Sequence, residues 1–145
     1  MRTRINMAER SGDAAESIRR ASRILLALMF VGAGILHLRD PGPFLAIVPR
    51  SLPRPGLLVA ISGTAEILGG AALCFQRTRR AAGVGLMALL VAVFPANLQA
   101  LSTGMRIGGH AVPHALLWAR LPLQLALVAW VYWACVSQRS RRGFD

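Results

Sequence analysis

The sequence predicts an all-α fold, an integral membrane four-helix bundle with a proline-rich interfacial loop between helices 1 and 2. Composition is the first reason. Of the 145 residues, 54% are hydrophobic and 16% are charged, which is more apolar surface than a soluble domain of this size can bury. Spacing is the second reason, because the apolar residues form runs of about twenty, the length that crosses a bilayer core as a helix.

The first part of the chain is predicted to hold a tail, a span and a loop. Residues 1–21 form a basic cytoplasmic tail, and residues 22–38 form the first span. A cleaved signal peptide is the alternative, but no small-x-small cleavage site ends the apolar run. Residues 39–56 contain five of the eight prolines, which excludes a continuous helix. This loop is expected to lie in the interface or fold back over the outer mouth of the bundle.

Three further spans complete the predicted bundle, at residues 57–75, 81–101 and 115–136. A short basic turn joins the first two of these spans. Residues 138–145 form a second basic cytoplasmic tail. We therefore expect one domain, residues 22–137, between two tails.

The arginines predict the orientation of the chain. All 17 basic residues are arginines, and the net charge is +11. With the N-terminus inside, twelve arginines lie on the cytoplasmic side and four on the far side, with Arg120 set aside, so both termini are expected in the cytoplasm. No zinc-finger, RNP or aromatic-interleaved basic pattern accompanies the charge. The arginines are therefore expected to contact the lipid bilayer and no nucleic acid.

One acid, Glu66, lies inside the apolar run at residues 57–75. It is about 14 Å from either end of the run, near the bilayer centre, where an unpartnered acid costs several kcal/mol. The side chain should therefore face the interior of the bundle. Gly63, Gly69 and Gly70 lie three or four residues away on the same helix face and would let another helix come close.

Other polar side chains are expected in the same outer half of the bilayer. His37 ends the first span, and Asn97 lies about one turn inside the outer end of the third. Arg120 and Gln124 share one face of the fourth span, and Gln124 lies at about the depth of Glu66. We interpret these five residues as one buried polar cluster that could bind a ligand.

Two prolines lie inside these spans. Pro95 frees the carbonyl group of Val91, and Pro122 frees that of Trp118. Inside a membrane such carbonyl groups need partners in protein or water. Both prolines are consistent with a polar pocket, although kinks are common in membrane helices.

Four members of the cluster also have other interpretations. Glu66 is either a neutral acid that hydrogen-bonds a neighbouring helix or an ionised group paired with Arg120. Arg120 either joins the cluster or extends to the outer headgroups. Asn97 is either an interhelical hydrogen-bonding group or part of the site, and His37 is either part of it or an interfacial residue.

No catalytic residue and no metal site is predicted. His110 and His114 are four residues apart, but Pro113 places them in a loop without a neighbouring carboxylate. Cys74 and Cys135 belong to no Cys-x-x-Cys motif, and we interpret them as small apolar fillers rather than a redox pair.

Several stretches resemble the DoxX-like family of small bacterial four-helix membrane proteins, over residues 22–134 and in the expected order. They are Gly34-Ile35-Leu36-His37, Phe44-Leu45-Ala46-Ile47-Val48-Pro49, Ser62-Gly63 with Glu66-Ile67-Leu68-Gly69-Gly70, Phe94-Pro95-Ala96-Asn97, and Arg120-Leu121-Pro122-Leu123-Gln124. The resemblance implies a multi-pass protein of the bacterial inner (plasma) membrane. Some relatives are associated with thiosulfate oxidation that feeds quinone, others with disulfide handling, and a distant animal branch with receptor assembly. This chain lacks the paired cysteines that a thiol–disulfide enzyme needs.

The main functional hypothesis is an accessory component of membrane redox chemistry, with a quinone or a small sulfur compound bound in the cluster. Glu66 and His37 would handle protons, and Arg120, Gln124 and Asn97 would hold an oxygen-rich ligand. No haem pair, flavin motif or dithiol is present, so a quinone is the one cofactor considered and a membrane or redox protein partner would be needed. A non-enzymatic membrane assembly factor is the alternative. A small carrier is a further alternative. It would require a homo-oligomer, because a single four-helix unit needs a repeat partner for alternating access. Whether the protein is an enzyme stays open.

Overall fold

The chain is mostly helical in the computed structural model, which describes the backbone of residues 2–137 and the side chains of residues 12–137. The long helices and the turn that ends the last one are α1 (Arg2–Arg39), α3 (Pro55–Ala72), α4 (Arg79–Thr103), α5 (His114–Val131) and the π-helical η1 (Tyr132–Val136). Shorter elements are the helix α2 (Gly42–Leu45) and the antiparallel strands β1 (Arg106–Ile107) and β2 (His110–Ala111).

Four helices in the described part of the chain are long and apolar enough to cross a membrane: Gly12–Arg39, Pro55–Ala72, Arg79–Thr103 and His114–Val136. This confirms the predicted all-α class and the number of apolar helices, with the last three spans placed to within a few residues. The predicted second tail, residues 138–145, lies outside the described residues.

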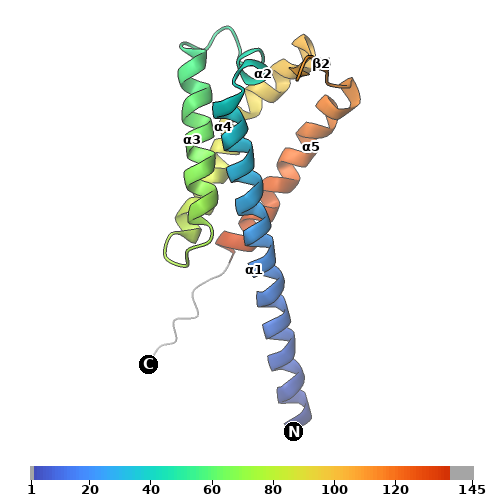
Figure 1. Ribbon diagram of the computed structural model, residues 1–145. Helices are drawn as coiled ribbons and strands as arrows, with labels where there is room; N and C mark the ends of the chain where they lie inside the picture. Colours follow the sequence, from blue (N-terminus) through green and yellow to red (C-terminus); the bar gives the residue numbers. More distant parts are fainter. Residues whose placement is uncertain (1, 138–145) are drawn as a thin grey trace.

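The first helix differs most from the prediction. It continues without a break from Arg2 to Arg39, so the structure shows no boundary at residue 21. The predicted tail contains no proline, and Gly12 is its one glycine, so nothing in the sequence forces the helix to stop there. Figure 1 shows the N-terminal part of α1 projecting beyond the bundle, at the end where α3 connects to α4.

The helices pack in neighbouring pairs. The most extensive interface joins α1 to α3, while α4 packs on α3 and α5 packs on α4. The final turn, η1, returns to α1 and α4 at the end from which the N-terminal part of α1 projects. Toward the other end, α5 leans away from α1, and α2 and the strands lie there (Figure 1).

The predicted proline-rich loop does not contain a continuous helix, and α2 is its one helical turn. The loop folds back on the bundle, because Ile47 is buried in a cluster with Ala100, Met105 and Leu117. After α4 the chain forms a short hairpin through Gly108 and Gly109, both with positive φ. A two-residue glycine turn of this kind is a hairpin signal, whereas only a loop was predicted around His110 and His114.

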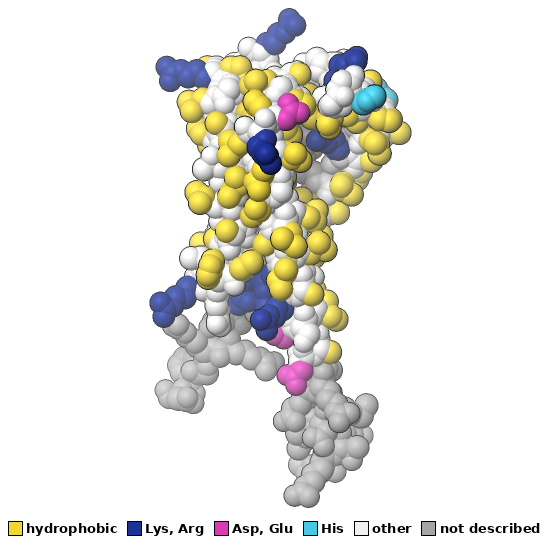
Figure 2. All heavy atoms as spheres, in the orientation of Figure 1, with side chains coloured by type: hydrophobic (Ala, Val, Ile, Leu, Met, Phe, Trp, Pro, Cys, Tyr) yellow, Lys and Arg dark blue, Asp and Glu magenta, His cyan; other side chains and the backbone are white. Residues whose placement is uncertain are grey.

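The outside of the bundle is apolar. Large side chains such as Leu28, Leu68, Leu123 and Leu125 are each 65–68% exposed. In Figure 2 hydrophobic side chains cover the flank of the bundle, and the arginines gather mainly toward its two ends. The buried core is small by comparison and lies around Leu26, Phe30, Leu73, Leu86, Leu90, Val131, Ala134 and Cys135.

The interface between α1 and α3 is built around glycines that face each other. A Cβ at Gly63 of α3 would lie 2.7 Å from Cβ of His37 on α1, and one at Gly34 of α1 would lie 3.1 Å from Cβ of Glu66 on α3. His37 therefore packs against Gly63, and Glu66 packs against Gly34, each on the opposite helix. Gly34 belongs to a stretch noted in the sequence, but its packing role was not predicted.

The other two predicted packing glycines face different helices. A Cβ at Gly70 would lie 3.0 Å from Cβ of Phe30, on α1. At Gly69 it would lie 2.8 Å from a methyl group of Leu86, on α4. The glycine-rich face of α3 therefore serves two neighbours, because consecutive residues of a helix point in directions about 100° apart.

Candidate polar site in the helix bundle

The structure brings His37 and Glu66 together across the α1–α3 interface. Nδ1 of His37 lies 3.3 Å from Oε2 of Glu66, and the two side chains are 16% and 10% exposed. Nδ1 also lies 2.8 Å from the carbonyl oxygen of Ala33, one turn back in α1. Because a carbonyl group can only accept, Nδ1 carries a hydrogen and donates it to Ala33. In the neutral ring, Nε2 is then an acceptor.

Glu66 keeps one carboxyl oxygen without a hydrogen bond. Oε2 is buried and has no hydrogen-bonding partner among the residues that the structure describes. The nearby Nδ1 of His37 lies within ion-pair distance, but its hydrogen is directed to Ala33. A buried polar atom without a partner costs about 1–3 kcal/mol, so such atoms are rare unless they have a role. This oxygen is the strongest sign of a functional site in the bundle.

The proline-rich loop covers this pair from one side. The ring of Phe44, in α2, stacks on the ring of His37 with centroids 3.7 Å apart and planes 22° apart. His37 is therefore held between an aromatic ring and a glycine face. This contact does not fit a purely interfacial histidine.

A second polar pair lies between α4 and α5. Nδ2 of Asn97 donates to Oε1 of Gln124 over 2.8 Å, and Nε2 of Gln124 donates to the carbonyl oxygen of Leu90. Gln124 is buried. Both the oxygen and the nitrogen of the Gln124 amide are therefore hydrogen-bonded.

Both predicted intrahelical prolines are in place, Pro95 in α4 and Pro122 in α5. The carbonyl group bonded by Gln124 belongs to Leu90, which directly precedes Val91, the residue whose carbonyl Pro95 frees. The polar pair between α4 and α5 therefore lies at the proline-disrupted turn of α4.

Among the described residues, Arg120 is hydrogen-bonded to neither pair, although it interacts electrostatically with His37. It is half-buried, and its Nη1 donates to the thioether sulfur of Met105 over 2.9 Å. Within the described part of the chain it forms no ion pair with Glu66, whose nearest ionisable partner is His37. A thioether is a weak acceptor, and a guanidinium has five N–H groups, so Arg120 retains donors for a ligand.

The predicted single cluster is therefore divided. No hydrogen bond or ion pair between described residues joins the His37–Glu66 pair to the Asn97–Gln124 pair. The cause is the pairing of the helices, because α1 packs mainly on α3 and α5 packs mainly on α4. Equal depth in the bilayer, the basis of the prediction, does not determine which helix a side chain faces.

A hollow of about 670 Å³ lies near these residues, between the α2 loop and the hairpin. Its lining includes Pro43, which precedes the ring stacked on His37, and Met105, which accepts the hydrogen bond from Arg120. Asp40 and His114 add polar groups at its wall. The hollow is therefore lined by Met105, which contacts Arg120, and by Pro43, the chain neighbour of Phe44. His37, Glu66 and Arg120 are not among its lining residues.

The two cysteines are free and lie in different environments. Cys135 is buried in the core, beside Gly83, which agrees with its predicted role as a filler. Cys74 is exposed just beyond the end of α3, so its prediction as a filler was wrong. An apolar run does not show which residues at the end of a helix are buried and which are exposed.

Comparison with known proteins gives a family but no activity. A family model described as a domain of unknown function (DUF8561) matches residues 26–135, which include most of the four apolar helices and both polar pairs. No curated protein and no solved structure matches the chain.

Proposed function

We propose a function from the site itself, because the chain belongs to the DUF8561 family, a domain of unknown function. The protein is a multi-pass protein of the bacterial inner membrane with both termini in the cytoplasm. It is related to the DoxX-like proteins and acts as an accessory component of membrane redox chemistry. It binds a quinone, or a small sulfur compound of similar oxygen-rich character, at the His37–Glu66 pair.

Membrane insertion is supported by how the apolar residues are distributed. The outer surface of the helices carries large exposed leucines, which water would disfavour and lipid tails would accept. The arginine-rich α3–α4 turn and the N-terminal part of α1 lie at one end, as the twelve-to-four excess of arginines on the cytoplasmic side requires. The stretches that resemble DoxX-like proteins contain Gly34, His37, Gly63 and Glu66, the four residues that build the α1–α3 pair.

The observation that carries the proposal is the buried Oε2 of Glu66 without a hydrogen-bonding partner. In a neutral carboxyl group this position can donate or accept a hydrogen bond, and beside it His37 retains Nε2 as an acceptor. Ionisable residues inside a membrane bundle are costly and typically mark ligand or proton pathways. The pair is therefore suited to exchange protons with a bound carbonyl or hydroxyl group.

Arg120 and the hollow fit the same ligand class. The guanidinium has N–H groups beyond the one bonded to Met105, and Met105 also lines the hollow. The hollow is lined by Pro43, the residue before Phe44, whose ring stacks on His37. A bound quinone would supply the redox chemistry, while electrons would come from a membrane protein partner.

Mass spectrometry of the full chain purified in mild detergent tests the proposal. The wild type should carry a co-extracted quinone at near-stoichiometric level. Glu66→Gln should lose about tenfold of it, since one hydrogen bond to a buried acid is replaced. Ser62→Ala is the matched control, because Ser62 is buried on the same helix but its hydroxyl donates within the helix, to Val59. A wild type with no quinone beyond the bulk membrane ratio, or equal retention in Glu66→Gln, would refute the proposal.

A second candidate function, a non-enzymatic membrane assembly factor, is favoured by the Asn97–Gln124 pair. Its amides bond each other and the Leu90 carbonyl, an arrangement that locks two helices and needs no ligand. The same purification distinguishes the candidates. A single dominant protein partner without quinone supports assembly.

A further inference from the structure

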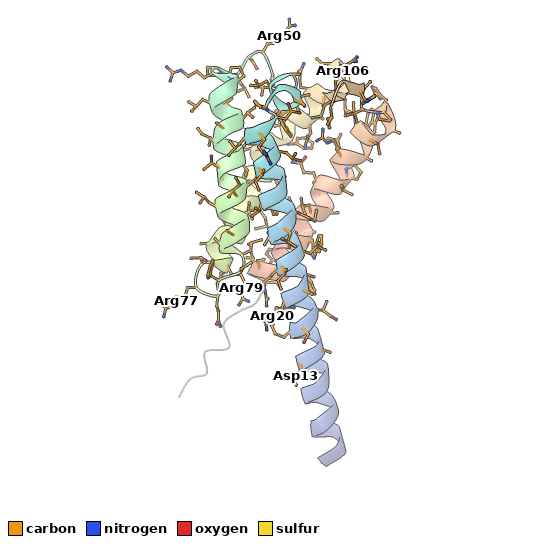
Figure 3. The ribbon with its side chains drawn as sticks, viewed as in Figure 1. Asp13, Arg20, Arg50, Arg77, Arg79 and Arg106 are labelled. Atoms are coloured by element: carbon orange, nitrogen blue, oxygen red, sulfur yellow. The ribbon has the colours of Figure 1, made fainter. Side chains whose placement is uncertain are left out.

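A second hollow, of about 560 Å³, lies at the opposite end of the bundle. It is bounded by α1, by the segment after α3 and by the start of α4. Figure 3 places Arg20 and Arg79 at this end, close to the turn that carries Arg77. The residues that line the hollow are Glu16, Arg20, Arg23, Ile24, Cys74, Gln76 and Arg79.

One arginine in this hollow is part of the framework. Arg23 is 7% exposed and donates to Oε1 of Glu16 over 2.6 Å and to the carbonyl oxygen of Ala134 over 3.4 Å. The bond to Ala134 links α1 to η1, whereas the bond to Glu16 lies within α1. The guanidinium of Arg19 adds a second link between the same elements, because it lies 5.2 Å from the ring centre of Trp133.

The other two arginines are available to a ligand. Arg20 and Arg79 form no hydrogen bond or ion pair with any residue in the described part of the chain. They come from different elements, α1 and α4, and line one hollow. Three arginines against one glutamate leave an excess of positive charge, and guanidinium groups match the geometry of phosphate oxygens.

Apolar groups accompany these charges. Ile24 lines the hollow and is 49% exposed, and Phe75, next to Cys74, is 65% exposed. Figure 2 shows hydrophobic side chains along the flank of the bundle next to the arginines at this end. A ligand that joins a phosphate to hydrocarbon chains would contact both kinds of surface.

We propose that this hollow binds the phosphate headgroup of an anionic phospholipid, held between Arg20 of α1 and Arg79 of α4. The inference rests on the proposed membrane insertion and goes beyond the proposed redox role. It distinguishes a defined site from the general attraction of arginines to an anionic surface. In a defined site, two particular arginines matter more than their neighbours.

Lipid binding to the purified full chain tests the site. The probe is phosphatidylglycerol, with phosphatidylcholine as the uncharged comparison, and bound lipid is counted by native mass spectrometry. The double variant Arg20→Gln/Arg79→Gln should bind phosphatidylglycerol about 25-fold more weakly, from about fivefold for each arginine near a lipid phosphate. Arg77→Gln/Arg80→Gln is the control, because it removes the same charge at the same end of the bundle but neither residue lines the hollow.

Retained binding in the control, together with loss in the Arg20/Arg79 variant, supports the site. An equal loss in both variants would show only a diffuse surface potential and would overturn it. Displacement of the lipid by millimolar inorganic phosphate would reassign the hollow to a free anion and would also overturn the lipid proposal. Because the protein is already extracted from membranes by detergent in these measurements, failure of lipid selectivity is separate from failure of membrane insertion.

Discussion

Nδ1 of His37 lies 3.3 Å from Oε2 of Glu66. The two residues come this close because each packs against a glycine of the opposite helix, His37 against Gly63 and Glu66 against Gly34. The glycines allow the backbones of α1 and α3 to approach closely, as small residues do between membrane helices. That approach buries two ionisable side chains side by side. The structure of the interface and the chemistry of the site are therefore one feature.

Gly34→Ala should separate the two helices. The added Cβ would meet the carbonyl oxygen of Gly63, a backbone atom that cannot move aside, and would lie 2.8 Å from Ile67. We expect a loss of about 1–3 kcal/mol in the free energy of unfolding. Thermal unfolding in detergent, followed by circular dichroism, measures it.

Gly32→Ala is the control on the same helix, since a Cβ there has no neighbour within 4 Å. It should leave stability unchanged or raise it by up to about 1 kcal/mol through helix propensity. If both variants lose the same free energy of unfolding, close packing at Gly34 does not hold the two helices together.

Glu66→Gln should cost only about 1 kcal/mol, because the amide keeps the shape and most hydrogen-bonding capacity of a neutral acid. In double-variant cycles, Glu66→Gln should couple to His37→Ala by at least about 0.5 kcal/mol. It should couple to Arg120→Gln by less, since Arg120 bonds Met105 instead. A loss of about 3–5 kcal/mol together with strong coupling to Arg120 would indicate an ionised, paired Glu66. An inert Glu66→Ala would contradict a buried site altogether.

Gln124→Leu should loosen α4 from α5. The substitution leaves the Asn97 amide without its acceptor and removes the donor to Leu90. The expected loss is about 1–2 kcal/mol, and adding Asn97→Leu should recover part of it, since interhelical hydrogen bonds in membranes contribute about 0.6–1.7 kcal/mol. Gln99→Leu, on α4 and without a side-chain hydrogen bond among the described residues, should change stability less. Equal losses of stability from the substitutions at residues 99 and 124 would refute the claim that the Gln124 hydrogen bonds hold α4 to α5.

Topology can be tested through Cys74, which is exposed while Cys135 is buried. A membrane-impermeant maleimide should label Cys74 in inside-out vesicles and leave it unlabelled in intact cells, with Cys74→Ala as the control for background. Reporter fusions after Arg54 and after Arg79 should report opposite sides of the membrane. A cytoplasmic signal from position 54 would invert the orientation.

The sequence predicted the features that depend on local composition. Run length and hydrophobicity located four helices, proline density located the loop, and the cost of burying an acid singled out Glu66. Partners could not be predicted in the same way. The contacts of His37 with Glu66 and with Phe44 depend on which helices are neighbours and on the loop that returns over them.

Other features were not predicted because their signals are weak in a single sequence. Gly34 is one of 14 glycines, and only its position opposite Glu66 gives it a packing role. Arg20 and Arg79 are separated by most of two helices, so no spacing rule relates them. Depth along a helix does not determine which neighbour a side chain contacts, so it could not assign Met105 to Arg120 or His37 to Glu66.

Infrared difference spectroscopy tests the central claim most directly, because it observes the Glu66 carboxyl group itself. The purified protein is measured with and without a short-chain quinone, alongside Glu66→Gln and the Ser62→Ala control. If the site binds the quinone, its addition should shift a carboxyl band in the wild type and in Ser62→Ala, and that change should be missing in Glu66→Gln. A spectrum at saturating quinone in which no band depends on Glu66 would contradict the account.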